Sequence, residues 1–180
     1  MQARASSSAQ VHEALLDSAA RLHVLAKVHE LLYANSDSTQ RVLMPQLLQS
    51  LGDALRQSFG RAHPHVTLEI ACDSMELPTQ QAVALALIAN ESITNAYKHA
   101  FPSESVGIIA VRLQLTHEGA ICLRIEDTGS SFAPPDGGRN IGMTLIRSFA
   151  AQLCGTLDVV SRGAAMGTSV TLTVAGQASG

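Results

Sequence analysis

The spacing of apolar residues predicts a series of helices along the chain. The predicted helices cover residues 10–33, Val42 to Phe59, Thr79 to just before Pro102, and Ile141 to Leu153. In each segment apolar residues recur every three or four positions, which places them on one side of a helix. The first helix is long and cannot bury its apolar stripe on itself. It must pack on a partner helix, from another chain or from sequence outside these residues.

Other segments alternate between apolar and polar residues, as strands do. The predicted strands are residues 66–71, 106–116, 120–126, 156–161 and 168–174. The tight turn His117-Glu118-Gly119 joins the second strand to the third, and the last two strands form a final hairpin. Together with the helices, these strands predict an α/β sandwich in which helices cover one face of a mixed sheet. Residues 130–139, rich in proline and glycine, are predicted to form a mobile loop.

Composition narrows the class of protein. The chain has 180 residues, of which 46% are hydrophobic and 15% charged, as expected for one compact domain with a short appendage. A net charge of −3 gives no electrostatic signature of nucleic-acid binding. The longest apolar run, Ala82 to Ala89, is too short to cross a bilayer, and no signal-peptide pattern opens the chain. The cysteines lack ligand spacing, which favours reduced thiols in a cytoplasm; they are Cys72, Cys122 and Cys154.

A polar face on the third helix carries the first candidate chemistry. Glu91, Asn95 and Lys98 fall within about 60° of one another, because each helical residue advances by about 100°. Carboxylate and amide oxygens suit Mg²⁺, and a lysine one turn further can meet a phosphate. The opposite side is apolar and suited to packing on a sheet; it consists of Ala82, Leu85, Ala89, Ile93, Ala96 and Ala100. The alternative, and the commoner outcome for such a stretch, is the solvated face of a surface helix.

The strand at residues 120–126 carries the second candidate. Its alternation places Ile121, Leu123 and Ile125 on one face, and Asp127 continues that inward register. A buried carboxylate needs a hydrogen-bond donor, which the exocyclic amine of adenine would supply. Gly129 would let a flat base approach the backbone. The alternative is a simple Asp-Thr-Gly turn.

Weaker phosphate-compatible features follow in the sequence. Gly142 lies at a predicted helix start, where backbone N–H groups favour an anion that Arg139 could also reach. Gly167 and Thr168 enter the last strand, although hairpins often use glycine.

Taken in order, these motifs resemble the ATP-binding domain of sensor histidine kinases. The motifs are Glu91-x-x-x-Asn95-Ala96-x-Lys98-His99, Asp127-x-Gly129, Gly142, Gly155 and Gly167-Thr168. That domain has the Bergerat-type ATPase fold shared with gyrase, built on a mostly antiparallel sheet. Residues 28–33, Val-His-Glu-Leu-Leu-Tyr, resemble the end of the second dimerisation helix in one bacterial subfamily of these kinases.

The resemblance implies a role for each matching residue. Asn95 would coordinate Mg²⁺, and Glu91 would act on the metal, directly or through water, or polarise the phosphoacceptor; these two are the candidate catalytic residues. Asp127 would bind the adenine amine. The other implied ATP contacts are Lys98, His99, Gly129, Arg139, Gly142 and Thr168. Residues 130–139 would be a lid over the nucleotide.

The resemblance also implies an organisation and an activity. Residues 1–37 would be a partial dimerisation helix, 38–176 the ATP-binding catalytic domain, and 177–180 a tail. The domain would transfer the γ-phosphoryl group of ATP to a histidine outside this segment, so that phosphorylation of the chain by itself is not expected. The implied partners are a response-regulator receiver domain and the kinase's own dimerisation domain, in a cytoplasmic homodimer without nucleic acid.

Two departures from the family pattern leave other functions open. Ser131 and Asn140 stand where the family usually has glycine. They favour a degenerate phosphotransfer or docking module of the same fold that no longer uses ATP. A serine kinase of this fold acting on a regulatory partner is the third reading, which the motif at residues 28–33 disfavours.

Overall fold

The computed structural model describes residues 41–102, 105–130, 141–163 and 166–176, together with the single helical positions Ser18, Leu22 and Ala26. Most of the predicted first helix, the motif at residues 28–33 and all of the predicted lid at 130–139 except Ser130 therefore lie outside the described residues. None of the helices in the described part combines the length and apolarity that crossing a bilayer requires.

A five-stranded mixed sheet forms the base of the fold, in the order β2-β4-β5-β7-β6. Its strands are β2 (Val66–Cys72), β4 (Gly107–Leu115), β5 (Ile121–Asp127), β6 (Thr156–Ser161) and β7 (Thr168–Val174). β2 pairs with β4 in parallel, and all the other neighbours are antiparallel. Both predicted hairpins are confirmed, and so is the mixed, mostly antiparallel sheet.

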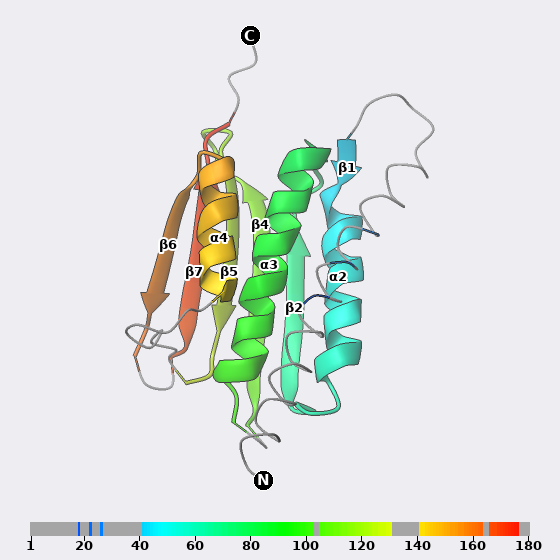
Figure 1. Cartoon of the computed structure of the whole chain (residues 1–180), viewed down its shortest axis with the longest axis vertical. Helices are drawn as coiled ribbons and strands as arrows, with labels where there is room; N and C mark the ends of the chain where they lie inside the picture. The colour runs from blue at the N-terminus through cyan, green and yellow to red at the C-terminus, as the bar shows by residue number, and fades with distance from the viewer. Residues whose placement is uncertain are drawn as a thin grey trace.

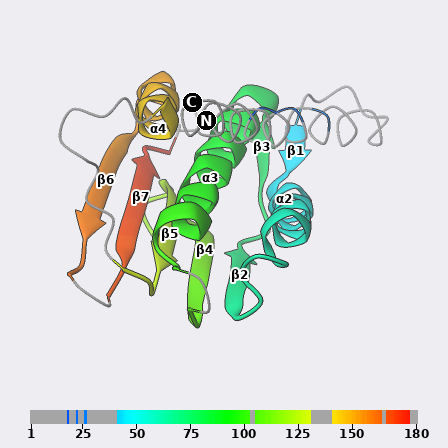
Figure 2. The ribbon, with the colours of Figure 1, turned by 60° about the horizontal axis from the view of Figure 1, so that its bottom comes forward.

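In the described part of the chain, α-helices cover one face of this sheet, as Figures 1 and 2 show. They are α2 (Met44–Phe59), α3 (Thr79–His99) and α4 (Ile141–Gln152). The strand alternation explains the arrangement: Leu123 and Ile125 of β5 are buried beneath the helices, whereas Arg124 between them is exposed on the opposite face. The predicted sandwich with helices on one face is confirmed.

The start of α2 differs from the prediction, which began that helix at Val42. Val42 lies in β1 (Arg41–Leu43), which pairs antiparallel with β3 (Glu76–Pro78) in a small separate sheet. The helix begins only at Met44, with Pro45 in its first turn, where a missing N–H costs nothing. Strands of three residues are too short for an alternation to be recognised, so the sequence pattern showed neither of them.

The central helix α3 lies between α2 and α4 (Figure 1), and most of its residues are buried. The reading of α3 as a surface helix with a solvated polar face is therefore wrong: Glu91 is only 5% exposed. The apolar side predicted for this helix, from Ala82 to Ala100, is buried as expected. Near its carboxyl end, Tyr97 stacks on Phe59 of α2 with ring centroids 5.0 Å apart.

We expect the Tyr97→Ala variant to lose about 3–5 kcal/mol of unfolding free energy, because it removes a fully buried aromatic side chain and leaves a cavity. Urea unfolding followed by circular dichroism measures this loss. Val106→Ala is the matched control, since Val106 is 80% exposed and its truncation should change stability by less than about 0.5 kcal/mol. Equal effects of the two substitutions would contradict the packing of α3 on α2.

Candidate functional site

A pocket opens between α3 and α4 above the ends of β5, β6 and β7. It holds about 510 Å³, counting its open mouth. Its lining residues are Ser92, Asn95, Ala96, Ala100, Ile125, Asp127, Met143, Val159, Thr168 and Val170. The walls are mainly apolar, and a few polar side chains converge on the space within them. This combination is typical of a small-molecule site that encloses an apolar group and orients it by hydrogen bonds.

The carboxylate of Asp127 is the charged group of this pocket. Asp127 ends β5 and is 5% exposed, which confirms its predicted inward register. Its Oδ1 accepts a hydrogen bond from the backbone N–H of Gly129 at 2.9 Å, and its Oδ2 accepts one from the backbone N–H of Thr168 at 3.1 Å. Burial raises the pKa of this carboxyl, while the two hydrogen bonds and nearby Arg162 act to lower it. Each oxygen retains acceptor capacity for a donor in the pocket.

Two glycines make the position of Asp127 possible. Gly167 has φ +72°, and a Cβ there would clash with the backbone and side-chain oxygens of Asp127. At Gly129 a Cβ would clash with the carbonyl oxygen of Ala100, which also accepts hydrogen bonds from the N–H and hydroxyl of Ser130 at 2.8 and 3.0 Å. Gly129 thus lets β5 and α3 approach each other. It does not line the pocket, and its place beneath a base remains a prediction.

Arg162 holds Asp127 from the other side of the strand end. Its Nη2 donates to the carbonyl oxygen of Asp127 and its Nη1 to Oε1 of Glu126, both at 2.9 Å. Glu126 also accepts a hydrogen bond from Arg112 at 3.2 Å. Sequence reasoning missed Arg162, because it lies in a turn far along the chain and no local spacing links it to β5.

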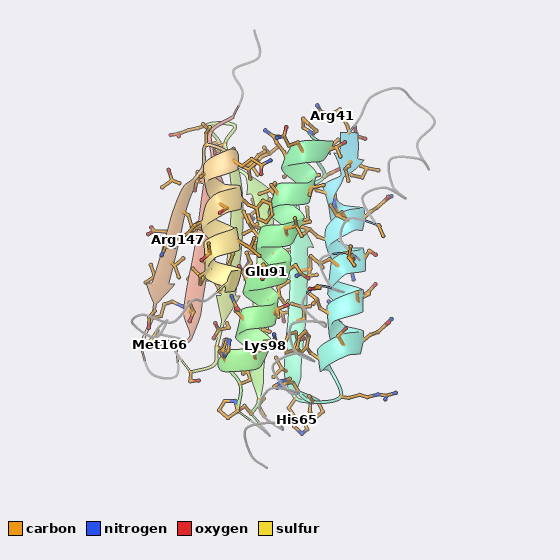
Figure 3. All side chains as sticks on the ribbon, in the orientation of Figure 1. Arg41, His65, Glu91, Lys98, Arg147 and Met166 are labelled. Carbon is orange, nitrogen blue, oxygen red and sulfur yellow. The ribbon has the colours of Figure 1, made fainter. Side chains whose placement is uncertain are left out.

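The polar residues of α3 divide between the pocket and its surroundings. Asn95 lines the pocket and is half-buried. Glu91, one turn earlier, does not line it, and Nδ2 of Asn90 donates to Oε1 of Glu91 at 3.3 Å. Figure 3 shows Glu91 and Lys98 on the same helix, with Lys98 nearer its carboxyl end. Lys98 is half-buried and His99 exposed, and neither lines the pocket.

Of the predicted site residues, the structure brings three into one pocket: Asn95, Asp127 and Thr168. Gly142 is buried in the first turn of α4, next to the lining residue Met143, and Arg139 lies outside the described residues. Ser92 lines the pocket but was missed by sequence reasoning. It precedes Asn95 by three residues, so helical periodicity alone could have placed it on the same side.

Two family models match the chain, and together they span nearly all of it. The model described as the histidine kinase-like ATPase domain matches residues 61–174, and a second model, described as histidine kinase, matches residues 1–59. The chain belongs to the histidine kinase-like ATPase domain family. The resemblance inferred from the order of the sequence motifs is thereby confirmed.

Curated relatives of this ATPase-domain chain are histidine kinases. It is 24% identical over 145 residues to Blue-light-activated histidine kinase 2 of Erythrobacter litoralis, a match covering 74% of this chain and 41% of that protein. It is 26% identical over 169 residues to the sensor histidine kinase PdtaS of Mycobacterium tuberculosis, a match covering 88% of this chain and 32% of that protein. The chain thus spans well under half the length of these relatives.

Solved structures share the fold of this histidine kinase-like ATPase domain. The histidine kinase domain of a blue-light activated histidine kinase from Erythrobacter litoralis aligns with a TM-score of 0.78 and 21% identity, covering 88% of this chain and 74% of that one. The ATP binding domain of PrrB from Mycobacterium tuberculosis aligns with a TM-score of 0.55 and 19% identity, covering 79% of this chain and all of that one.

We expect Gly167→Ala to destabilise the domain more than Gly119→Ala. The two glycines have φ of +72° and +75°, so a side chain at either position meets the same backbone strain of about 1–2 kcal/mol. Only the Cβ at position 167 also clashes with Asp127; nothing lies within 4 Å at position 119. Thermal unfolding of the two variants measures the difference. Similar losses would show that Gly167 serves the turn and not the placement of Asp127.

The raised pKa of Asp127 predicts a pH dependence of stability. Because burial raises this pKa in the folded chain, folding favours proton uptake by the group. Its contribution to stability is complete below the ordinary pKa of a carboxyl and is lost as pH rises through the raised value. Asp127→Asn lacks this titration. We subtract the unfolding free energy of the variant from that of the parent protein, each measured by urea unfolding at successive pH values. We expect this difference to fall as pH rises from the ordinary carboxyl pKa through the raised pKa of Asp127. A constant or rising difference would contradict the effect of burial.

Proposed function

We propose that this chain binds ATP in the described pocket and serves as the ATP-binding catalytic domain of a sensor histidine kinase. The observation that carries the proposal is the buried carboxylate of Asp127 in an otherwise apolar pocket. A carboxylate accepts hydrogen bonds and donates none, so it favours a base that presents an amine. Adenine presents an amine at its 6-position, whereas guanine presents a carbonyl oxygen there. The apolar lining suits the two faces of a purine.

The ribose and phosphates would extend from the pocket toward the carboxyl end of α3. Asn95 stands at the border of the pocket and offers an amide oxygen, a ligand type that Mg²⁺ accepts. Among the described residues, no three His, Cys, Asp or Glu side chains cluster to hold a metal by themselves. A cation would therefore depend on Asn95, on phosphate oxygens and on water, with Glu91 acting through water from one turn away. Lys98 and His99, further along α3, would meet the phosphates.

Phosphoryl transfer in this proposal depends on positioning and charge. Magnesium, when bound, would neutralise charge that develops on the phosphates. Asn95 would orient the metal, and Glu91, held by Nδ2 of Asn90, would orient or polarise the acceptor. The acceptor is proposed to be a histidine outside this segment. An acid-labile phosphate on that acceptor would distinguish it from the serine acceptor of the alternative function.

The names of the relatives support the wider proposal. They are histidine kinases, and one is named a sensor kinase. We propose residues 1–37 as part of a dimerisation helix, 38–176 as the catalytic domain and 177–180 as a tail. The match of a histidine kinase model to residues 1–59 supports the first of these assignments. A second copy of the kinase and a response-regulator receiver domain are the proposed partners, in the cytoplasm.

Calorimetric titration with a non-hydrolysable ATP analogue, with and without Mg²⁺, tests the proposal. We expect Asp127→Asn to weaken binding by about ten- to a hundredfold, because it replaces a charged acceptor of the base amine. We expect Asn95→Asp to disrupt productive Mg²⁺ coordination and to reduce the gain in affinity that Mg²⁺ provides, because the new carboxylate repels the phosphates that share the metal.

Adenosine, which lacks phosphates, separates the two effects. Its binding should weaken in Asp127→Asn and remain unchanged in Asn95→Asp. Unchanged ATP affinity in Asp127→Asn would contradict the placement of the base. A parent protein that binds no nucleotide at millimolar concentration would favour the docking module that no longer uses ATP.

A further inference from the structure

We propose that Ser92 forms a second, direct hydrogen bond to the nucleobase and thereby contributes to the choice of base. Ser92 is 4% exposed, and its hydroxyl has no hydrogen-bond partner in the structure. A serine within a helix commonly donates to the carbonyl four residues earlier, but this one does not. A buried hydroxyl without a partner is unfavourable, and it indicates a group that the structure does not contain.

The position of Ser92 indicates which group that is. Ser92 lines the same pocket as Asp127 and lies on one ridge of α3 with Ala96 and Ala100, which are spaced four residues apart. The carbonyl oxygen of Ala100 lies beside Gly129, two residues beyond Asp127 at the end of β5. Ser92 lies two helical turns before Ala100 on this ridge and one turn before Ala96, in the same pocket lining as Asp127. Most of the pocket wall is apolar, and besides Ser92 the polar residues that line it are Asn95, Asp127 and Thr168.

The chemistry of a base complements the two groups. Asp127 can only accept, which fits the exocyclic amine, whereas a hydroxyl can donate to a ring nitrogen beside that amine. On adenine those nitrogens are N1 and N7, one on each side of the amine-bearing carbon. The two groups together would read a donor next to an acceptor, which distinguishes adenine from guanine, whose O6 and N7 both accept. This inference rests on the proposed binding of ATP.

Ser92→Ala tests the inference by calorimetry with ATP, 1-deaza-ATP and 7-deaza-ATP, each with Mg²⁺. We expect the substitution to weaken ATP binding about three- to tenfold, as the loss of one neutral hydrogen bond should. The parent protein should bind one of the deaza nucleotides less tightly than ATP by a similar factor, and Ser92→Ala should bind that analogue and ATP equally. The melting temperature without nucleotide should be unchanged or higher, because an unpaired buried hydroxyl has been removed.

Thr94→Val is the matched control. Thr94 is also a buried α3 residue whose hydroxyl has no partner, but it does not line the pocket. Valine keeps its shape, so this variant should bind ATP as the parent protein does. Unchanged ATP affinity in Ser92→Ala would overturn the inference, as would continued discrimination against the same deaza nucleotide. A parent protein that binds no ATP would instead overturn the proposed function, and this inference with it.

Discussion

The buried carboxylate of Asp127 is the constraint on which the rest of the site depends. A charge at the end of a strand, shielded from water, is tolerated only where donors surround it. Backbone N–H groups of Gly129 and Thr168 supply two of them. Arg162 donates a third hydrogen bond, to the backbone carbonyl oxygen of Asp127 at the same strand end. These donors come from the turn after β5, from β7 and from the turn after β6. The arrangement of the sheet is therefore part of the site.

The helix α3 combines the core of the domain with one wall of the pocket. Small side chains such as Ala96 and Ala100 let the helix lie close to β5, and the carbonyl of Ala100 receives two hydrogen bonds from Ser130. Packing against α2 and α4 on either side restrains the helix (Figure 1). Functional side chains on a rigid, buried element keep their geometry better than those on a loop. The roles proposed for Asn95 and Ser92 therefore fall on a helix that is mainly core.

Much of the fold and part of the site could be predicted from local patterns. Alternation identified the strands of the large sheet and the inward register of Asp127, and helical spacing placed Asn95 on α3. The order of the motifs identified the family, although each motif by itself was ambiguous. The burial of Glu91 could not be predicted. Helical spacing shows which residues share a side of α3, but it does not show which other parts of the chain cover that side.

The sequence by itself determined the helices α2, α3 and α4 to within a few residues, the strands of the large sheet, and the apolar side of each, because these properties follow from residue periods of 3.6 and 2. Only the tertiary structure decided what lies beside what. It paired β1 with β3, set β7 next to β5, brought Arg162 to the carbonyl of Asp127 and left the hydroxyl of Ser92, a pocket-lining residue, buried without a partner. The physical reason is that such contacts join residues far apart in the chain. Their free energy depends on how the whole core packs and not on any local repeat.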